Sequence, residues 1–297
     1  MPSDSVKNYL HLHLIVFIWG FTAILGALIS IEALPLVWFR MTLAVLFIFV
    51  YIVIKKIPFK LSKKTTLQFL VAGFIIAMHW FTFFKAIKVS NVSVTLACLS
   101  TGAFFTSLLE PIFYKKKIVW YEVMFGLVVI IGLSLIFRVA TNYFFGIILA
   151  LTSAFLSALF SVINSLFVKK HDATVISFYE LSGGVLLLTL FLLFGNTFST
   201  DFFKLSSNDW FYLVVLASVC TAYAFIASTK IMKVLSPYTV MLTINLEPIY
   251  GIILAVLIFK EKENMSFQFY IGALVILTTV LANALIKANK KRKKSKE

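Results

Sequence analysis

The chain has 297 residues, of which 61% are hydrophobic and 13% are charged, and its formal net charge is +15 at pH 7. Soluble domains contain about 45–50% apolar and about 25% charged residues, and a chain of this length has too little interior to bury the excess. The composition excludes disordered chains, collagen, disulfide scaffolds and ordinary soluble enzymes. It predicts a protein whose main solvent is lipid.

Ten apolar stretches follow one another along the chain, each close to the roughly 20 residues that a helix needs to cross a hydrocarbon core. In chain order they cover residues 10–30, 34–54, 66–87, 92–113, 119–137, 144–168, 174–194, 210–231, 238–259 and 267–286. None of the connections is long enough for a separate folded domain. The sequence therefore predicts an all-α integral membrane protein with ten transmembrane helices.

The basic residues are distributed unevenly between the two sides of these helices. If the N-terminus is cytoplasmic, twenty of the Lys and Arg residues fall on the inner side, six fall on the outer side, and Arg40 lies within a helix. Lys and Arg are enriched in cytoplasmic segments, so both termini are predicted to be cytoplasmic in a multi-pass protein of the cell membrane. The basic tail directly follows the last stretch, which favours contact with anionic lipid over contact with nucleic acid.

An internal repeat divides the chain into two halves. A shift of 146 residues aligns Ile112-Phe113 with Ile258-Phe259, and upstream the register changes so that Arg40 falls near Glu180. Because each unit contains five helices, the second unit enters the membrane inverted, as is common in secondary transporters. The expected organisation is a first repeat at 10–137, a second repeat at 144–286 and a cytoplasmic tail at 287–297.

Charged side chains within spanning helices are costly, which makes them candidates for function. Glu247 is the strongest candidate, because it lies near the middle of the ninth stretch beside Asn245. Pro248 follows directly and is expected to kink the helix and act as a hinge. Glu247 either lines a cavity or carries a proton, or it is a buried structural partner of Arg40. The sequence leaves both interpretations open.

Four further residues within the predicted helices are candidates, at depths that range from the middle of a helix to near its outer end. Arg40 either pairs with a carboxylate or binds an anionic substrate, and a structural role is favoured for Arg40 and for Glu180. His79 is either a hydrogen-bonded packing residue or a ligand. If His79 and Lys85 both face the cavity, they favour a substrate with a carboxylate or a phosphate.

The sequence contains no pattern that indicates a cofactor, a metal site or an enzyme. Cys98 and Cys220 lie in apolar runs without the spacing of a metal site or a disulfide framework. An intramembrane enzyme would need a paired acid and base, and a sensor would usually carry a soluble output domain. Neither feature is found, so a non-enzymatic protein without a cofactor or metal is expected.

Several segments are similar to the EamA-type members of the drug/metabolite transporter superfamily. They are Trp19-Gly20, Phe39-Arg40, "FKAIKVSNVSVTLACLSTGAFF" at 84–105, "INLEPIYGIILAVLIFKEKE" at 244–263 and "FYIGALVIL" at 269–277. The resemblance implies a ten-helix secondary transporter of the cytoplasmic membrane, often an exporter of amino acids or related metabolites. Thr101-Gly102 stands where many members have proline, which argues against equivalent roles for the fourth and ninth helices.

The leading prediction is an exporter of amino acids or related small polar metabolites that works by alternating access as a monomer or a homodimer. The predicted cavity residues are Trp19, Arg40, His79, Trp80, Lys85, Glu180, Asn245 and Glu247. The alternatives are a proton-coupled carrier of anionic or phosphorylated metabolites and a non-transporting membrane sensor or structural protein. Any proton coupling would depend on Glu247 and His79.

Overall fold

The computed structural model describes residues 4–294 except 116, 118–123, 126–127, 130, 133–134, 136–140 and 261–264. All regular structure within these ranges is helical. The first half contains α1 (Asp4–Leu28), α2 (Ala33–Lys55), α3 (Lys63–Val89), α4 (Val92–Leu99) and α5 (Gly102–Phe113). The second half contains η1 (Thr141–Tyr143), α7 (Phe144–Phe167), α8 (Ala173–Phe194), η2 (Asp201–Phe203), α9 (Ser207–Ala217), η3 (Ser218–Tyr223), α10 (Ala224–Ile231), α11 (Pro237–Ile244), α12 (Glu247–Phe259) and α13 (Phe267–Lys294).

Seven helical segments in the described part of the chain are long and apolar enough to cross a membrane. They are Lys7–Leu28, Ala33–Lys55, Lys63–Val89, Val92–Phe113, Phe144–Phe167, Ala173–Phe194 and Ser207–Ile231. Shorter apolar helices follow at Glu247–Phe259 and Phe267–Thr279. Most of the fifth predicted helix, 119–137, lies outside the described residues, so the total of ten helices stays a prediction.

Two of the predicted helices are interrupted at matching positions of the two halves. Turns at residues 100–101 and 245–246 separate α4 from α5 and α11 from α12. A shift of 146 residues places the first break within one residue of the second. Paired discontinuous helices at corresponding positions are a feature of transporters with inverted repeats. The fourth and ninth helices therefore share a geometry, whereas the sequence argument concerned their roles.

Each break has a local cause in the sequence. Ser100 Oγ and Thr101 Oγ1 donate to the carbonyl oxygens of Ala97 and Cys98 at 2.6 and 2.8 Å, and such bonds compete with the helical hydrogen bonds. No proline is needed at this position. Pro248 lies in the first turn of α12, where its missing N–H would have no helical partner in any case. It therefore begins a helix and does not kink one.

The eighth predicted helix also departs from regular geometry. It comprises α9, the π-helix η3 and α10. Within η3, Thr221 Oγ1 donates to the Leu216 carbonyl five residues back at 2.7 Å. π-Helical turns inside α-helices are often found at functional sites, and η3 contacts the candidate site directly.

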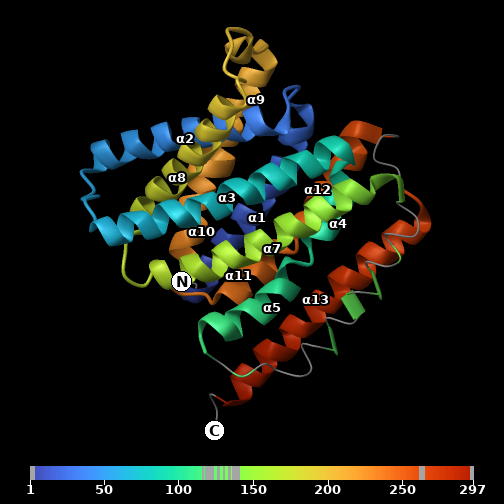
Figure 1. Cartoon of the computed structure of the whole chain (residues 1–297). Helices are drawn as coiled ribbons and strands as arrows, with labels where there is room; N and C mark the ends of the chain where they lie inside the picture. Colours follow the sequence, from blue (N-terminus) through green and yellow to red (C-terminus); the bar gives the residue numbers. More distant parts are fainter. Residues whose placement is uncertain are drawn as a thin grey trace.

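The helices pack around α3, which lies against both α7 and α8. Figure 1 shows α3 and α7 through the middle of the bundle, α2 and α8 on one flank, and α13 on the opposite flank. Glycines bring α3 and α8 close together. A Cβ at Gly73 would overlap the carbonyl oxygen of Glu180, and one at Gly183 would overlap the backbone of Leu70. Small residues permit this backbone approach between membrane helices.

Candidate functional site

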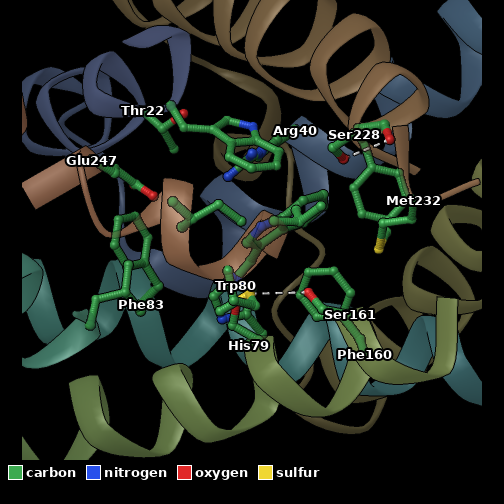
Figure 2. A pocket seen from close by; sticks show the side chains of 17 residues that line it. Thr22, Arg40, His79, Trp80, Phe83, Phe160, Ser161, Ser228, Met232 and Glu247 are labelled. Carbon is green, nitrogen blue, oxygen red and sulfur yellow. Dashed lines mark hydrogen bonds between the residues drawn. The ribbon is translucent and has the colours of Figure 1, made fainter. Parts of the chain in front are cut away.

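A cavity of about 60 Å³ lies between helices of the two halves. Its lining residues, several of which are labelled in Figure 2, are Trp19, Thr22, Arg40, His79, Trp80, Phe83, Leu99, Ser157, Phe160, Ser161, Phe225, Ser228, Met232, Val240, Met241, Ile244 and Glu247. The wall is aromatic and apolar, with a small number of polar groups. Sites for small molecules are commonly built in this way.

Arg40 is the buried cation of this cavity, with 1% of its surface exposed. Its Nε donates to Thr221 Oγ1 at 2.6 Å, and its guanidinium carbon lies 3.9 Å from the centre of the Trp80 ring. These contacts fix the plane of the guanidinium group. Nη1 is buried and has no hydrogen-bond partner among the described residues, which leaves one strong donor unused beside the cavity.

The π-helix η3 holds two cavity residues of the first half in place. Thr221 receives the hydrogen bond from Arg40, and the Cys220 carbonyl accepts a bond from Trp19 Nε1 at 3.2 Å. Because a π-helical turn shifts the backbone bonding pattern, its hydroxyl and carbonyl groups can bond to neighbouring helices. The second half therefore sets the orientation of side chains from α1 and α2.

Glu247 is the buried carboxylate of the cavity, 6% exposed at the start of α12. Among the residues that the structure describes, no salt bridge joins it to Arg40. Figure 2 shows both side chains at the same cavity. The interpretation of Glu247 as the direct ionic partner of Arg40 therefore does not match the geometry. The cavity lining instead contains a basic residue, Arg40, and an acidic residue, Glu247, that are not bonded to each other.

His79 lines the cavity while its ring is anchored to α7. Nδ1 lies 2.9 Å from the Ser153 carbonyl oxygen and 2.8 Å from Ser153 Oγ, and Ser153 Oγ also donates to the His79 carbonyl at 3.0 Å. This group of bonds ties α3 to α7. His79 is thus a hydrogen-bonded packing residue that also lines the cavity, and its role as a ligand stays a prediction.

The structure brings together Trp19, Arg40, His79, Trp80 and Glu247, but it places three other candidates outside the cavity lining. Lys85 Nζ lies 3.2 Å from Glu32 Oε2, because its position near the end of α3 brings it within reach of the α1–α2 connection. Glu180 is completely buried against Asn164 of α7. Asn245 is buried in the turn between α11 and α12.

Sequence reasoning missed the serines of the cavity wall. Ser157 and Ser161 of α7 and Ser228 of α10 line the cavity. On α7, serines recur every four residues at 153, 157, 161 and 165, and residues at this spacing share one helix face. This serine stripe predicts a polar helix face, although it contains no charged residue.

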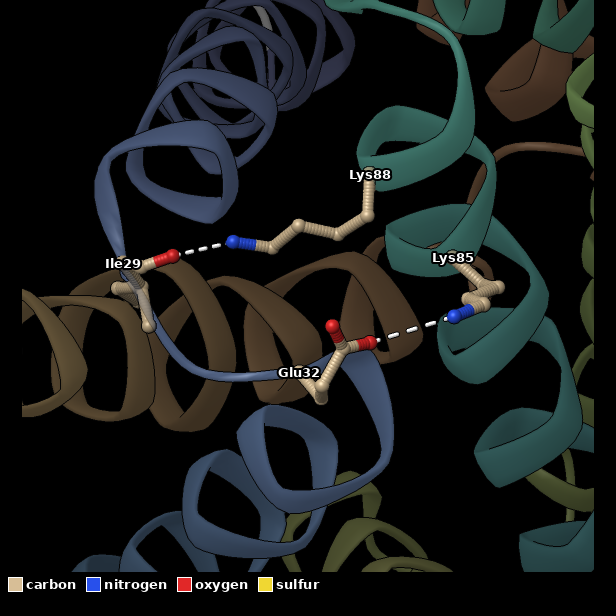
Figure 3. A network of polar contacts seen from close by, with 4 residues as sticks. All are labelled: Ile29, Glu32, Lys85 and Lys88. Atoms are coloured by element: carbon tan, nitrogen blue, oxygen red, sulfur yellow. Dashed lines mark hydrogen bonds and ion pairs between the residues drawn. The ribbon is translucent and has the colours of Figure 1, made fainter.

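Polar contacts join the elements at one end of the bundle, where the α1–α2, α3–α4 and α8–α9 connections lie. Ser30 donates to Asp209 from its backbone N–H and its hydroxyl, both at 2.7 Å. Figure 3 shows Lys88 donating to the Ile29 carbonyl and Lys85 paired with Glu32. These bonds link α1, α3 and α9, so they connect the two halves at this end.

Comparison with known proteins identifies the family. The EamA-like transporter family matches residues 7–138 and 144–285. The chain belongs to this family. The EamA-like chain is therefore a multi-pass membrane protein of a transporter family, as its apolar helices also indicate.

The chain is also similar to two other proteins. The "Uncharacterized transporter YxxF" of Bacillus subtilis (strain 168) is 23% identical over 205 residues, which cover 66% of the EamA-like chain and 63% of the relative. A protein of known crystal structure has a TM-score of 0.69 at 16% identity, with 96% of this chain and 99% of the other chain covered. At this identity the second similarity shows the fold alone.

Proposed function

We propose that the chain is a secondary transporter that exports amino acids or related small polar metabolites by alternating access. Two inverted repeats of five helices, at 10–137 and 144–286, would form the two moving halves. The excess of Lys and Arg on one side supports cytoplasmic termini and a position in the cytoplasmic membrane. Discontinuous helices at matching positions of the two halves support this class of mechanism.

The observation that carries the substrate class is the pair of opposite charges at one cavity. Nη1 of Arg40 has no hydrogen-bond partner among the described residues. Glu247 lines the same cavity, and within the described part of the chain it forms no salt bridge with Arg40. A zwitterionic amino acid would complement both, with its carboxylate at Arg40 and its ammonium group at Glu247. Charge-assisted hydrogen bonds are about twice as strong as neutral ones, so this arrangement favours such ligands over neutral solutes.

The size of the cavity supports a change of conformation during transport. Its volume of about 60 Å³ is well below the roughly 300–1,000 Å³ of typical ligand pockets. An amino acid would therefore enter only after the halves move apart. The polar contacts around Asp209 close one end of the bundle, whereas the cavity lining extends to Met232 and Val240 near the other end.

Counterflow in proteoliposomes tests the proposal. Vesicles loaded with an unlabelled amino acid should accumulate the labelled form. Amines and carboxylic acids with the same side chain should compete with the labelled amino acid at least about tenfold more weakly than the unlabelled amino acid does. Arg40→Gln should weaken competition by carboxylic acids, and Glu247→Gln should weaken competition by amines. Wild-type protein that exchanges no compound from a panel of amino acids, nucleosides and organic acids would refute a carrier and favour a sensor or structural protein.

A carrier of anionic or phosphorylated metabolites is the second candidate, and the unused donor of Arg40 favours it. For that substrate class the carboxylate of Glu247 is repulsive when ionised. Glu247→Gln should then improve exchange of organic anions, whereas it should impair exchange of zwitterions. The same variant therefore separates the two candidates by the sign of its effect.

A further inference from the structure

A second buried polar site lies beside the cavity, formed by Glu180 of α8 and Asn164 of α7. Both side chains are 0% exposed, and Asn164 Nδ2 donates to Glu180 Oε2 at 3.1 Å. The two remaining oxygens, Glu180 Oε1 and Asn164 Oδ1, are buried and have no hydrogen-bond partner among the described residues. Two acceptors without donors in one apolar site are energetically unfavourable.

A single proton resolves this arrangement. When Glu180 is the neutral acid, protonated at Oε1, the O–H can donate to Asn164 Oδ1 while Nδ2 continues to donate to Oε2. The acid and the amide then form a cyclic pair that satisfies all four groups. The ionised form would be a buried carboxylate held by one amide donor, and burying a charge without a partner of opposite sign is strongly unfavourable.

The cationic and titratable groups near α8 are occupied elsewhere or exposed. The described helices packed against α8 include α2, α3 and α10. Their titratable side chains are Arg40, Tyr51, Lys55, Lys63, Lys64, His79, Lys85, Lys88 and Lys230. Arg40 and His79 bond to Thr221 and Ser153, Lys85 and Lys88 bond at the α1–α2 connection, and the other five are exposed. α7, which supplies Asn164, carries no titratable residue.

The pair is separate from the cavity yet connected to it. Neither Glu180 nor Asn164 lines the cavity, but Phe160 and Ser161 of α7 do, and they lie four and three residues before Asn164 on the same helix face. The close contact of Gly73 with the Glu180 carbonyl shields the site from the α3 side. A movement of α7 that widens the cavity would therefore also separate the acid from its amide partner.

We propose that the Glu180–Asn164 pair is a proton-binding site that couples transport to proton movement. The proposal rests on the transport function above and assigns the coupling to a different residue from the cavity carboxylate. In each cycle the Glu180 carboxylate takes up one proton from water on one side of the membrane and releases it to water on the other. The proton is carried as the carboxylic acid that bonds to Asn164 Oδ1.

The variant Glu180→Gln separates coupling from transport, because its amide can donate to Asn164 Oδ1 and retains the shape of the protonated acid. We expect counterflow, which needs no net proton movement, to stay within about twofold of wild type. Accumulation driven by a pH gradient should fall at least tenfold. Glu110→Gln, which changes another buried carboxylate outside both sites, should retain the gradient-driven accumulation.

Infrared spectroscopy of the purified protein without substrate supplies a second readout. The carbonyl band that the buried Glu180 acid contributes should be present in wild type and lost in Glu180→Gln. If that variant does not fold, Asn164→Ala should retain the band and move it to higher frequency, because the acid loses its acceptor. It should also move the pH profile of gradient-driven transport.

Several outcomes would overturn the coupling. One is a wild-type protein that catalyses counterflow but does not accumulate substrate when a pH gradient is applied, and another is a Glu180→Gln protein that still accumulates substrate on the gradient. An acid band that persists unchanged in this variant would exclude Glu180 as the proton carrier. Accumulation that responds to a sodium gradient but not to a pH gradient would show that the coupling ion is sodium and not the proton. Absence of all exchange in wild type would refute the proposed function and the coupling together.

Discussion

At the scale of single residues, the most specific feature is the way Arg40 is held. The hydrogen bond to Thr221 and the face of Trp80 fix its guanidinium plane, and a desolvated cation over an indole ring contributes about 2 kcal/mol. Lysine could not replace this arrangement, since it has neither a planar group nor an Nε donor. The fixed plane gives the free Nη1 group a defined direction.

Thr221→Val tests this positioning. The variant retains the shape of threonine but removes the acceptor for Arg40 Nε, so the guanidinium loses its fixed plane. Hydrogen bonds to charged groups contribute about 1.5–3 kcal/mol, and we expect about a tenfold rise in the KM for exchange with a smaller change in kcat. Thr229→Val is the matched control, because the Thr229 hydroxyl is buried on α10 without a partner among the described residues. Equal KM values for both variants would contradict the positioning role of Thr221.

At the scale of helices, the contact between α3 and α8 determines the architecture of the second polar site. Gly73 lies on the Glu180 carbonyl and near the Gly184 backbone, so the two helices meet backbone to backbone. No larger residue fits at this crossing. The close contact excludes lipid and water from Glu180, and it makes the polar pair sensitive to small shifts of either helix.

Gly73→Ala should therefore destabilise the folded protein. The added methyl group meets backbone atoms, which cannot move as a flexible side chain can, and overpacking of this kind costs about 1–3 kcal/mol or more. We expect the unfolding temperature in detergent to fall by roughly 5 °C or more. Gly195→Ala is the control, since Gly195 follows α8 with φ of −80° and an added Cβ would lie 3.1 Å from its nearest neighbour, Thr197 Oγ1, and 3.2 Å from the Phe191 carbonyl oxygen. A Gly73→Ala protein as stable as this control would show that the helices can separate at little cost.

At the scale of the whole molecule, closure of one end depends on groups from both halves. Asp209 of α9 accepts bonds from the backbone and the hydroxyl of Ser30, which connects α1 to α2. Ser206 donates to the same carboxylate at 2.7 Å. Each alternating-access cycle would have to break these bonds and form them again. In the proposed cycle Asp209 would therefore set part of the free-energy difference between the closed and open states of this end.

Asp209→Ala should shift this equilibrium toward the open state. We expect a cysteine at Phe83, introduced after Cys98 and Cys220 are replaced by alanine, to react about tenfold or more faster with a membrane-impermeant maleimide added on the predicted extracellular side. Asp201→Ala is the control at the same end, because Asp201 forms an exposed pair with Lys204, and such pairs contribute little. Unchanged labelling in Asp209→Ala would mean that other contacts keep this end closed.

Much of the helical organisation could be predicted because long apolar runs are a strong signal. The breaks at 100–101 and 245–246 and the π-helix η3 could not, since they depend on where hydroxyl and carbonyl groups find partners in the folded bundle. Pro248 gave a partial signal, but its place in the first turn of α12 depends on the preceding turn. Residues 119–137 contribute little to this comparison because most lie outside the described part.

The sequence also predicted several residues that the structure brings to one cavity, namely Trp19, Arg40, His79, Trp80 and Glu247. They were found because charges and deep tryptophans are rare inside spanning helices. Lys85 was placed differently because a lysine near a helix end can turn to a loop carboxylate. The assignment of these residues to a substrate stays a prediction.

The equivalent positions of the two halves hold side chains of opposite type, the base Arg40 in the first and the acid Glu180 in the second. A dimer made of two first halves would bury two guanidinium groups, and a dimer made of two second halves would bury two carboxyl groups without a cation. Each half also lacks the partner atoms that the other supplies, such as Thr221 for Arg40. The two repeats are therefore not interchangeable, and a chain built from two copies of either one would lack groups that the other supplies.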